Sequence, residues 1–400
     1  MPRVNRRLDT SRTGLEAERL RNGLAELVVG QDDAINQIVG IYQTWLAGMT
    51  TPGRPIANLL FLGPTGTGKT RLVEATGELL LGSARAVLKI DCAEFQHSHE
   101  IAKLIGSPPG YLGHRETHAL LSQDMLDQHH SEDVKISFVL FDEIEKASDA
   151  LWNLLLGILD KATLTLGDNR RVDFSQTMIF MTSNLGAAEM GAMLRPKLGF
   201  AAAEHLGFSA DLAAMSALDE RSSRAGVEAA RRKFTPEFMN RIDKVVVFRR
   251  LGNQELDRIL TLELNRVQER IFASGIPGPF IFELTEDARS FLLHEGTDME
   301  YGARHLKRVV EKKIVHPLSN LVASNQISAG DLIRIEFDAD RKMFSFVTES
   351  EDLPMEVIVQ RTRPVPATCA ASASGVTFDG RHHDRRERQK SWESLLRVRR

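Results

Sequence analysis

Apolar and polar positions follow two different patterns along the chain, and the change falls near residue 250. Before it, short apolar runs alternate with stretches of helical periodicity, the pattern of a parallel sheet wrapped by helices. The runs are rich in β-branched and bulky apolar residues, as strands buried on both faces should be. We therefore predict strands at 58–62, 86–90, 136–141, 177–182 and 244–248.

After residue 250 the pattern becomes mainly helical, with apolar residues at helical spacing over 256–271 and over 306–318. Pro317 is expected to bend the end of the second helix. The runs 331–337 and 343–347 predict a small hairpin. The sequence thus predicts an α/β fold with four parts: a polar arm (1–20), a large domain (21–250), a smaller helical α+β domain (251–349) and a basic, largely disordered tail (350–400).

Composition excludes several classes of protein. The chain is 42% hydrophobic and 26% charged with a net charge of −3, which gives no general case for binding nucleic acid or an acidic membrane. No apolar run approaches the roughly 18 residues of a membrane span, and the basic N-terminus lacks the apolar core of a secretory signal. Cys92 and Cys369 lie far apart, so neither a disulfide framework nor a zinc site is indicated. We expect a cytoplasmic protein.

The segment "GPTGTGKT" (63–70) follows one predicted strand and precedes a helical stretch, which is the context of a phosphate-binding P-loop. Its glycines let backbone N–H groups wrap phosphates at the positive end of the helix. Lys69 would reach the β- and γ-phosphates of ATP, and Thr70 would hold Mg²⁺. The alternative is a glycine turn with an exposed lysine. The candidate nucleotide-binding residues here are Gly63, Pro64, Thr65, Gly66, Thr67, Gly68, Lys69 and Thr70.

Two further strands end in polar residues. In "FVLFDEIEKA" (138–147) Asp142 would bind Mg²⁺, and Glu143 would act as general base on the attacking water. Asn184, after the strand 177–182, would bond that water or the γ-phosphate. Alone, these residues read as solvated acids and a turn-forming asparagine. The order of P-loop, acidic pair and strand with asparagine favours ATP hydrolysis.

At this point the chain resembles an AAA+ ATPase, and more narrowly the second ATPase module of the Clp unfoldases and disaggregases. The residues that carry the resemblance are "VVGQDDAI" (28–35), "RPIANLLFLGPTGTGKT" (54–70), "KLIGSPPGYLG" (103–113), "FDEIEKA" (141–147), "VDFSQTMIFMTSNLG" (172–186), "FTPEFMNRID" (234–243) and "YGARHLKR" (301–308).

The resemblance implies roles for further residues. Val28 and Val29 would flank the adenine of ATP. Arg241 is similar to the arginine finger that reaches the γ-phosphate in the neighbouring subunit, and Arg304 to the arginine that senses nucleotide within its own chain. A homo-oligomeric ring, most often a hexamer, is the implied assembly. Each arginine could instead form a surface ion pair.

Two loops of the family contact polypeptides. Gly110, Tyr111, Leu112 and Gly113 resemble the loop that lines the ring's central pore and grips unfolded or tagged protein, although a core tyrosine is the alternative. The polar segment 166–171 is a candidate second pore loop. Members that dock on a ClpP-like peptidase carry an apolar-Gly-apolar tripeptide after the asparagine strand. Leu198, Gly199 and Phe200 offer one, and 206–208 offer a second, although both could simply pack on the core.

The resemblance therefore implies an ATP-driven unfoldase or chaperone of the stress response, working alone or with a peptidase. The alternative is an AAA+ motor or loader acting on nucleic acid, which the arginine-rich tail favours mildly. No helix-turn-helix segment accompanies that tail, and Tyr111 in its glycine setting favours polypeptide.

Overall fold

The computed structural model describes residues 9–10, 12–107, 119–187, 208–274, 278–298 and 302–350, which all lie in one compact unit, Met1–Ile358. The predicted pore loop at 110–113, the tripeptide at 198–200 and the tail from residue 351 lie outside the described residues. Among the described residues no helix is long and apolar enough to cross a membrane.

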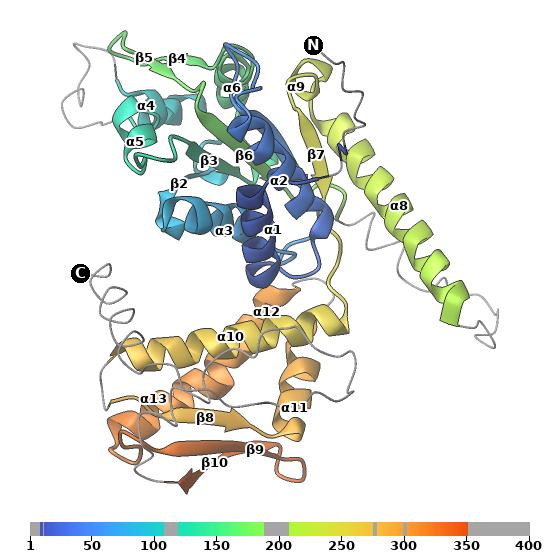
Figure 1. Cartoon of the computed structure of the whole chain (residues 1–400), viewed down its shortest axis with the longest axis vertical. Helices are drawn as coiled ribbons and strands as arrows, with labels where there is room; N and C mark the ends of the chain where they lie inside the picture. The colour runs from blue at the N-terminus through green and yellow to red at the C-terminus, as the bar shows by residue number, and fades with distance from the viewer. Residues whose placement is uncertain are drawn as a thin grey trace, which may run out of the picture. The chain divides into compact units, whose positions relative to one another are not determined.

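Five parallel strands form the central sheet, in the order β2-β3-β6-β1-β7 (Figure 1). Every predicted strand in the first part of the chain forms one of them, so the α/β prediction is confirmed. All six residues of β1 and all seven of β6 are buried, which explains why most of their residues are apolar. The strands are β1 (Ala57–Leu62), β2 (Val87–Asp91), β3 (Ser137–Asp142), β6 (Thr177–Ser183) and β7 (Lys244–Val247).

Alternate residues of the strands face two separate cores. Leu59, Phe61 and Phe180 pack with α1 (Leu15–Leu27), α2 (Asp32–Leu46) and α3 (Lys69–Leu81). Leu60 and Phe141 pack on the other side, with α6 (Asp149–Lys161) and the end of α8 (Phe208–Lys233). Side chains of a strand alternate between its faces, so each apolar run supplies both cores.

Helix α1 begins inside the segment that the composition predicts to be a polar arm. Ala17 and Leu20 are buried in it, because they fall on the apolar face of the helix that packs against α2 and α3. Shorter elements link the main ones, namely η1 (Ala84–Ala86), η2 (Cys92–Glu94), η3 (Ser98–Ile101), α4 (Ala102–Ile105), α5 (Gln123–Asp127), η4 (Ile144–Lys146), β4 (Thr163–Thr165), β5 (Arg171–Asp173) and α9 (Pro236–Met239).

The second part of the chain combines helices with a three-stranded sheet of order β10-β9-β8 (Figure 1). The predicted hairpin is β9 with β10, and β8 adds a parallel strand too short to be predicted. A five-residue π-helical segment, η5, precedes Pro317, where a proline lacks the N–H of a regular helix. The elements are α10 (Asn253–Ser274), β8 (Ile281–Leu284), α11 (Glu286–Gly296), α12 (Ala303–Val310), η5 (Glu311–Val315), α13 (His316–Ala323), β9 (Leu332–Asp338) and β10 (Met343–Ser350).

Candidate nucleotide-binding site

The predicted P-loop joins the end of β1 to the start of α3. Gly63, Gly66 and Gly68 have φ angles of 141°, 77° and 101°, a region that residues with a Cβ rarely adopt. A Cβ on Gly63 would also lie 2.7 Å from the carbonyl oxygen of Phe248. Glycine is therefore required here by backbone conformation, and at Gly63 also by the approach of β7.

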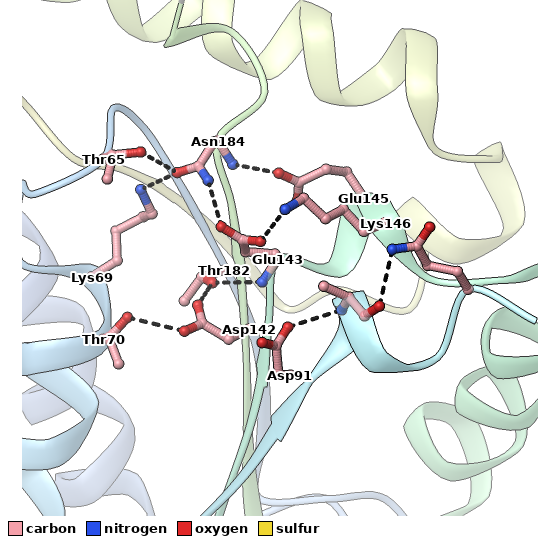
Figure 2. A network of polar contacts seen from close by, with 12 residues as sticks. Thr65, Lys69, Thr70, Asp91, Asp142, Glu143, Glu145, Lys146, Thr182 and Asn184 are labelled. Carbon is pink, nitrogen blue, oxygen red and sulfur yellow. Dashed lines mark hydrogen bonds and ion pairs between the residues drawn. The ribbon is translucent and has the colours of Figure 1, made fainter. Parts of the chain in front are cut away.

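Lys69 is 7% exposed, and its ammonium group points into the curve of the loop (Figure 2). Its Nζ donates to Gly63 O at 2.6 Å, to Pro64 O at 2.8 Å and to Asn184 Oδ1 at 3.0 Å. Burial lowers the pKa of Lys69 to about 8, although nearby carboxylates oppose that shift. Among the described residues, all hydrogen-bond partners of this buried cation are neutral oxygens, so it is suited to receive an anion such as a phosphate.

Asp142 ends β3 beside the first turn of α3. Thr70 Oγ1 lies 3.4 Å from Asp142 Oδ2, and the Thr182 hydroxyl donates to Asp142 Oδ1 (Figure 2). A hydroxyl and a carboxylate are hard oxygen donors of the kind that Mg²⁺ binds alongside phosphates. The residues present therefore fit a magnesium ion.

Glu143 follows Asp142 in a left-handed conformation with a φ angle of 55°, which is unusual for a residue other than glycine. The N–H of Glu143 donates to Thr182 Oγ1 at 3.1 Å. Its carboxylate lies 2.5 Å from Lys146 Nζ and 3.4 Å from Asn184 Nδ2. The ion pair raises the pKa of Lys146, chiefly through the hydrogen bond from its ammonium group to Glu143. The strained turn thus directs the carboxylate toward the end of β6.

One cavity of about 310 Å³ is lined by the polar side chains described above, namely Lys69, Thr70, Asp142, Glu143, Thr182 and Asn184. Val28 and Val29, each 5% exposed, lie on its wall, as the resemblance implies. Arg304 lines it from the start of α12, where the N–H of Ala303 donates to Gly66 O at 3.2 Å. The positive charge of Arg304 contributes to lowering the pKa of Lys69. The cavity therefore brings together predicted residues from both parts of the chain, although Gly63 and Pro64 are not among those that line it.

Arg241 does not line this cavity. It precedes β7, at the edge of the sheet where the strands begin, whereas the P-loop follows the edge where they end. Its guanidinium group lies 3.0 Å from Glu237 and 3.8 Å from Asp160. From Asn58, beside Arg241, to Gly63 the strand rises by about 17 Å. Arg241 therefore lies far from its own chain's Lys69.

Two residues that support the site, Gln31 and Glu145, are absent from the sequence prediction. Gln31, 3% exposed, donates to Thr67 O at 3.2 Å and to Arg249 O at 2.9 Å, and accepts from the N–H of Arg249. Glu145 accepts from the N–H of Asn184 at 3.1 Å. Both lie inside the stretches that carry the family resemblance, but nothing in their residue types indicates which backbone groups they bind.

Comparison with known proteins agrees with this geometry. Residues 54–245 match the AAA domain (Cdc48 subfamily), and residues 251–335 match the C-terminal, D2-small domain of ClpB protein. The fold and the site thus define a nucleotide-binding AAA module followed by a Clp-type small domain.

Curated relatives narrow the class. The chaperone protein ClpB of Rhizobium meliloti is 38% identical over 82% of this chain and 34% of its own length. The ATP-dependent Clp protease ATP-binding subunit ClpC of Staphylococcus saprophyticus is 36% identical over 84% and 38%, respectively. The chain belongs to the Clp family of AAA+ ATPases, and it spans about a third of the length of these relatives.

Solved structures of Hsp104 have the same fold. One, a closed state with ATPγS and FITC casein, has a TM-score of 0.66 and 26% identity over 83% of this chain and 52% of its own. Another, a casein complex of the S. cerevisiae protein in an extended conformation, has a TM-score of 0.68 and 27% identity over 82% and 52%.

Proposed function

We propose that this chain hydrolyses ATP with Mg²⁺ and uses the energy to unfold polypeptides. The observation that carries the proposal is the convergence of Lys69, Asp142, Glu143 and Asn184 on one cavity of about 310 Å³. These four side chains come from three separate segments of the chain. Together they supply a cation for phosphate, a metal ligand, a base and an amide for the attacking water.

The proposed chemistry assigns one task to each group. Lys69 and the P-loop N–H groups bind the phosphates, and Asn184 orients the water. Glu143 takes a proton from that water as its oxygen attacks the γ-phosphorus, and the bond from this phosphorus to the β,γ-bridging oxygen breaks to release ADP. Thr70 and Asp142 would hold Mg²⁺, which, when bound, neutralises charge on the β- and γ-phosphate oxygens.

In this proposal the subunits form a ring, in which Arg241 brings a further positive charge to the nucleotide of the neighbouring subunit. Because Arg241 lies at the opposite edge of the sheet from Lys69, it can act only on nucleotide held by another subunit. Each subunit of a closed ring then completes its neighbour's site, and a hexamer is the proposed size. Arg304, which lines its own chain's cavity, would respond to nucleotide within the subunit.

The proposed substrate is unfolded or tagged protein. Two Hsp104 structures of the same fold hold casein, which supports a polypeptide rather than a nucleic acid as cargo. Tyr111 and its flanking glycines would grip the chain in the pore. Ile105, which precedes that loop in the chain, contacts the candidate second pore loop, since the N–H of Gly167 donates to Ile105 O at 2.8 Å.

Other features of the proposal rest on relatives or on the sequence. Relatives named chaperone protein ClpB support a chaperone role. A cytoplasmic location is proposed from the sequence, in which no apolar run is long enough for a membrane span. We also propose a ClpP-like peptidase as partner, docked through Leu198, Gly199 and Phe200. A relative whose name describes a protease subunit supports this partner. Binding of that peptidase to the parent, but not to Phe200→Ala, would support the partner.

ATP hydrolysis measured with unfolded casein or with DNA tests the proposed cargo. We expect casein to stimulate turnover and DNA to leave it at the basal rate. Tyr111→Ala should lower the ratio of substrate unfolding to ATP hydrolysis at least tenfold, and Tyr111→Phe should retain it, because the aromatic face provides the grip. Stimulation by DNA alone would favour the nucleic-acid motor instead.

A further inference from the structure

Asn58 is the second residue of β1 and a polar side chain in an otherwise apolar strand, and it is 0% exposed. A buried amide costs free energy unless its donors are satisfied. Its Nδ2 donates to Leu159 O and to Arg241 O, each at 3.0 Å, so both amide hydrogens are used. Among the described residues its Oδ1 has no hydrogen-bond partner. Asn58 thus acts in the fold as a double donor.

The two carbonyls belong to the segments that hold the Arg241 side chain. Leu159 directly precedes Asp160, whose carboxylate lies 3.8 Å from the guanidinium group of Arg241. One amide therefore fixes the backbone of Arg241 relative to the end of α6 and to the acidic partner there. Removing the amide leaves two buried carbonyls unpaired and lets the two segments separate.

The backbone of Asn58 adds a second attachment. Its N–H donates to Asp243 Oδ2 at 2.7 Å, and the N–H of Asp243 donates to Asn58 O at 2.9 Å. The short segment from Arg241 to Asp243 is therefore tied at both ends to one residue of β1. The same strand leads directly into the P-loop of its own chain.

We propose that Asn58 is a positioning residue for Arg241, holding the arginine at the angle from which it reaches nucleotide on a neighbouring subunit. The inference rests on the proposed function, in which Arg241 acts in trans. A displacement of about 1 Å at a reacting group can lower a rate by about 10²-fold. Loss of the Asn58 amide should therefore reduce ATP turnover and leave the affinity of the same subunit for nucleotide unchanged.

Mixed rings test this role, because the defect should lie in the neighbour's site. Asn58→Ala is compared with Arg241→Ala, and Thr177→Val is the matched control. Thr177 is 1% exposed at the same edge of the sheet, and among the described residues its hydroxyl has no partner. The measurements are binding of a fluorescent ATP analogue, ATP turnover, and turnover after mixing with Glu143→Gln subunits or with Arg241→Ala subunits.

We expect Asn58→Ala to bind the analogue within about twofold of the parent and to turn over ATP about 10²-fold more slowly. Glu143→Gln subunits, which retain Asn58 and Arg241, should restore part of the activity. Arg241→Ala subunits should restore none, since neither partner then supplies a positioned arginine. Thr177→Val should behave as the parent does.

Turnover at the parent rate, weakened nucleotide binding or equal behaviour in both mixtures would overturn the inference. If Asn58→Ala does not fold, Asn58→Ser, which retains one shorter donor, takes the same test. Failure of both to fold would show that Asn58 only stabilises the sheet, which also overturns it. Parent-like turnover by Arg241→Ala alone would instead remove the proposed trans role of the arginine, whatever the result at Asn58.

Discussion

Lys69 Nζ donates to Asn184 Oδ1 across 3.0 Å, which joins the P-loop directly to the end of β6. With its two bonds to the carbonyls of Gly63 and Pro64, the ammonium group is satisfied by protein oxygens alone. An incoming phosphate must replace these bonds. The charge on the side-chain oxygen of residue 184 therefore determines how easily a phosphate displaces it from the ammonium group of Lys69.

Two substitutions at Asn184 should separate binding from hydrolysis. Asn184→Asp places a carboxylate beside Lys69 and repels phosphate, so affinity for ATP should fall at least tenfold. Asn184→Ala should change affinity only a few-fold and lower turnover by about 10²-fold, because the attacking water loses its orienting amide. Calorimetry and steady-state turnover measure the two effects. Equal affinities of Asn184→Asp and Asn184→Ala for ATP would contradict the proposal that phosphate binds Lys69 next to residue 184.

Replacing the proposed base should abolish turnover while leaving binding intact. General-base catalysis contributes about 10²–10⁴ in rate, so Glu143→Gln should hydrolyse ATP at least 10²-fold more slowly and still bind it. The matched control is Glu94→Gln, an exposed glutamate outside the cavity, which should hydrolyse ATP as the parent does. Turnover by Glu143→Gln at the parent rate would assign the base to another residue.

Nucleotide affinity should fall with rising pH, because burial lowers the pKa of Lys69 to about 8. Below that pH the side chain carries the charge that binds phosphate. Above it, binding must first return a proton to Lys69, so affinity should fall by up to about tenfold per pH unit. Binding measured from pH 7 to 9.5, with circular dichroism to confirm folding, checks this. Constant affinity across pH 8–9.5 would contradict the lowered pKa.

The edge of the sheet that carries the candidate site was predictable from sequence, because its residues stand in short, contiguous motifs. A glycine-rich turn, an acidic pair and an asparagine each follow a buried strand, and parallel strands end at one edge. Lys69, Asp142 and Asn184 therefore had to lie close together once the strands were placed.

The supporting residues were not predictable in this way. Gln31 and Asn58 bind backbone carbonyls that are distant in the chain, and a backbone group is the same at every position. Only the fold brings Arg249 within reach of Gln31, or Leu159 within reach of Asn58. The strand β8 was missed because its four residues are too few to show a period.

Gln31 should link nucleotide binding to the stability of the fold. Its side chain joins Thr67 in the P-loop to Arg249, just before the start of the small domain, through three hydrogen bonds. Gln31→Met keeps the volume and removes these three hydrogen bonds, each worth about 0.5–1.5 kcal/mol. We expect a lower melting temperature and weaker ATP binding. Gln37→Met, at an exposed position of α2, the helix that Gln31 directly precedes, is the control.

Gly167 should be essential for gripping substrate, because it contacts Ile105 and Gly106, which precede the predicted pore loop in the chain. A Cβ at this position would lie 2.5 Å from the carbonyl oxygen of Gly106, a backbone atom that cannot move without displacing the loop that follows it. Gly106 itself has a φ angle of 80°, a conformation that favours glycine, two residues before the segment 108–118 begins. A methyl group on Gly167 therefore displaces the root of the segment that carries Tyr111.

We expect Gly167→Ala to lower the unfolding of a tagged, stably folded protein at least tenfold relative to ATP hydrolysis. The matched control is Gly157→Ala in α6, where a Cβ meets no atom within 4 Å. That substitution should leave unfolding unchanged and stabilise the helix by about 0.5–1 kcal/mol, since alanine favours helix over glycine. Parent-like unfolding by Gly167→Ala would mean that the grip on substrate does not depend on the contact between Gly106 and Gly167. Loss of ATP hydrolysis in the same proportion would mean that the glycine supports the nucleotide site instead.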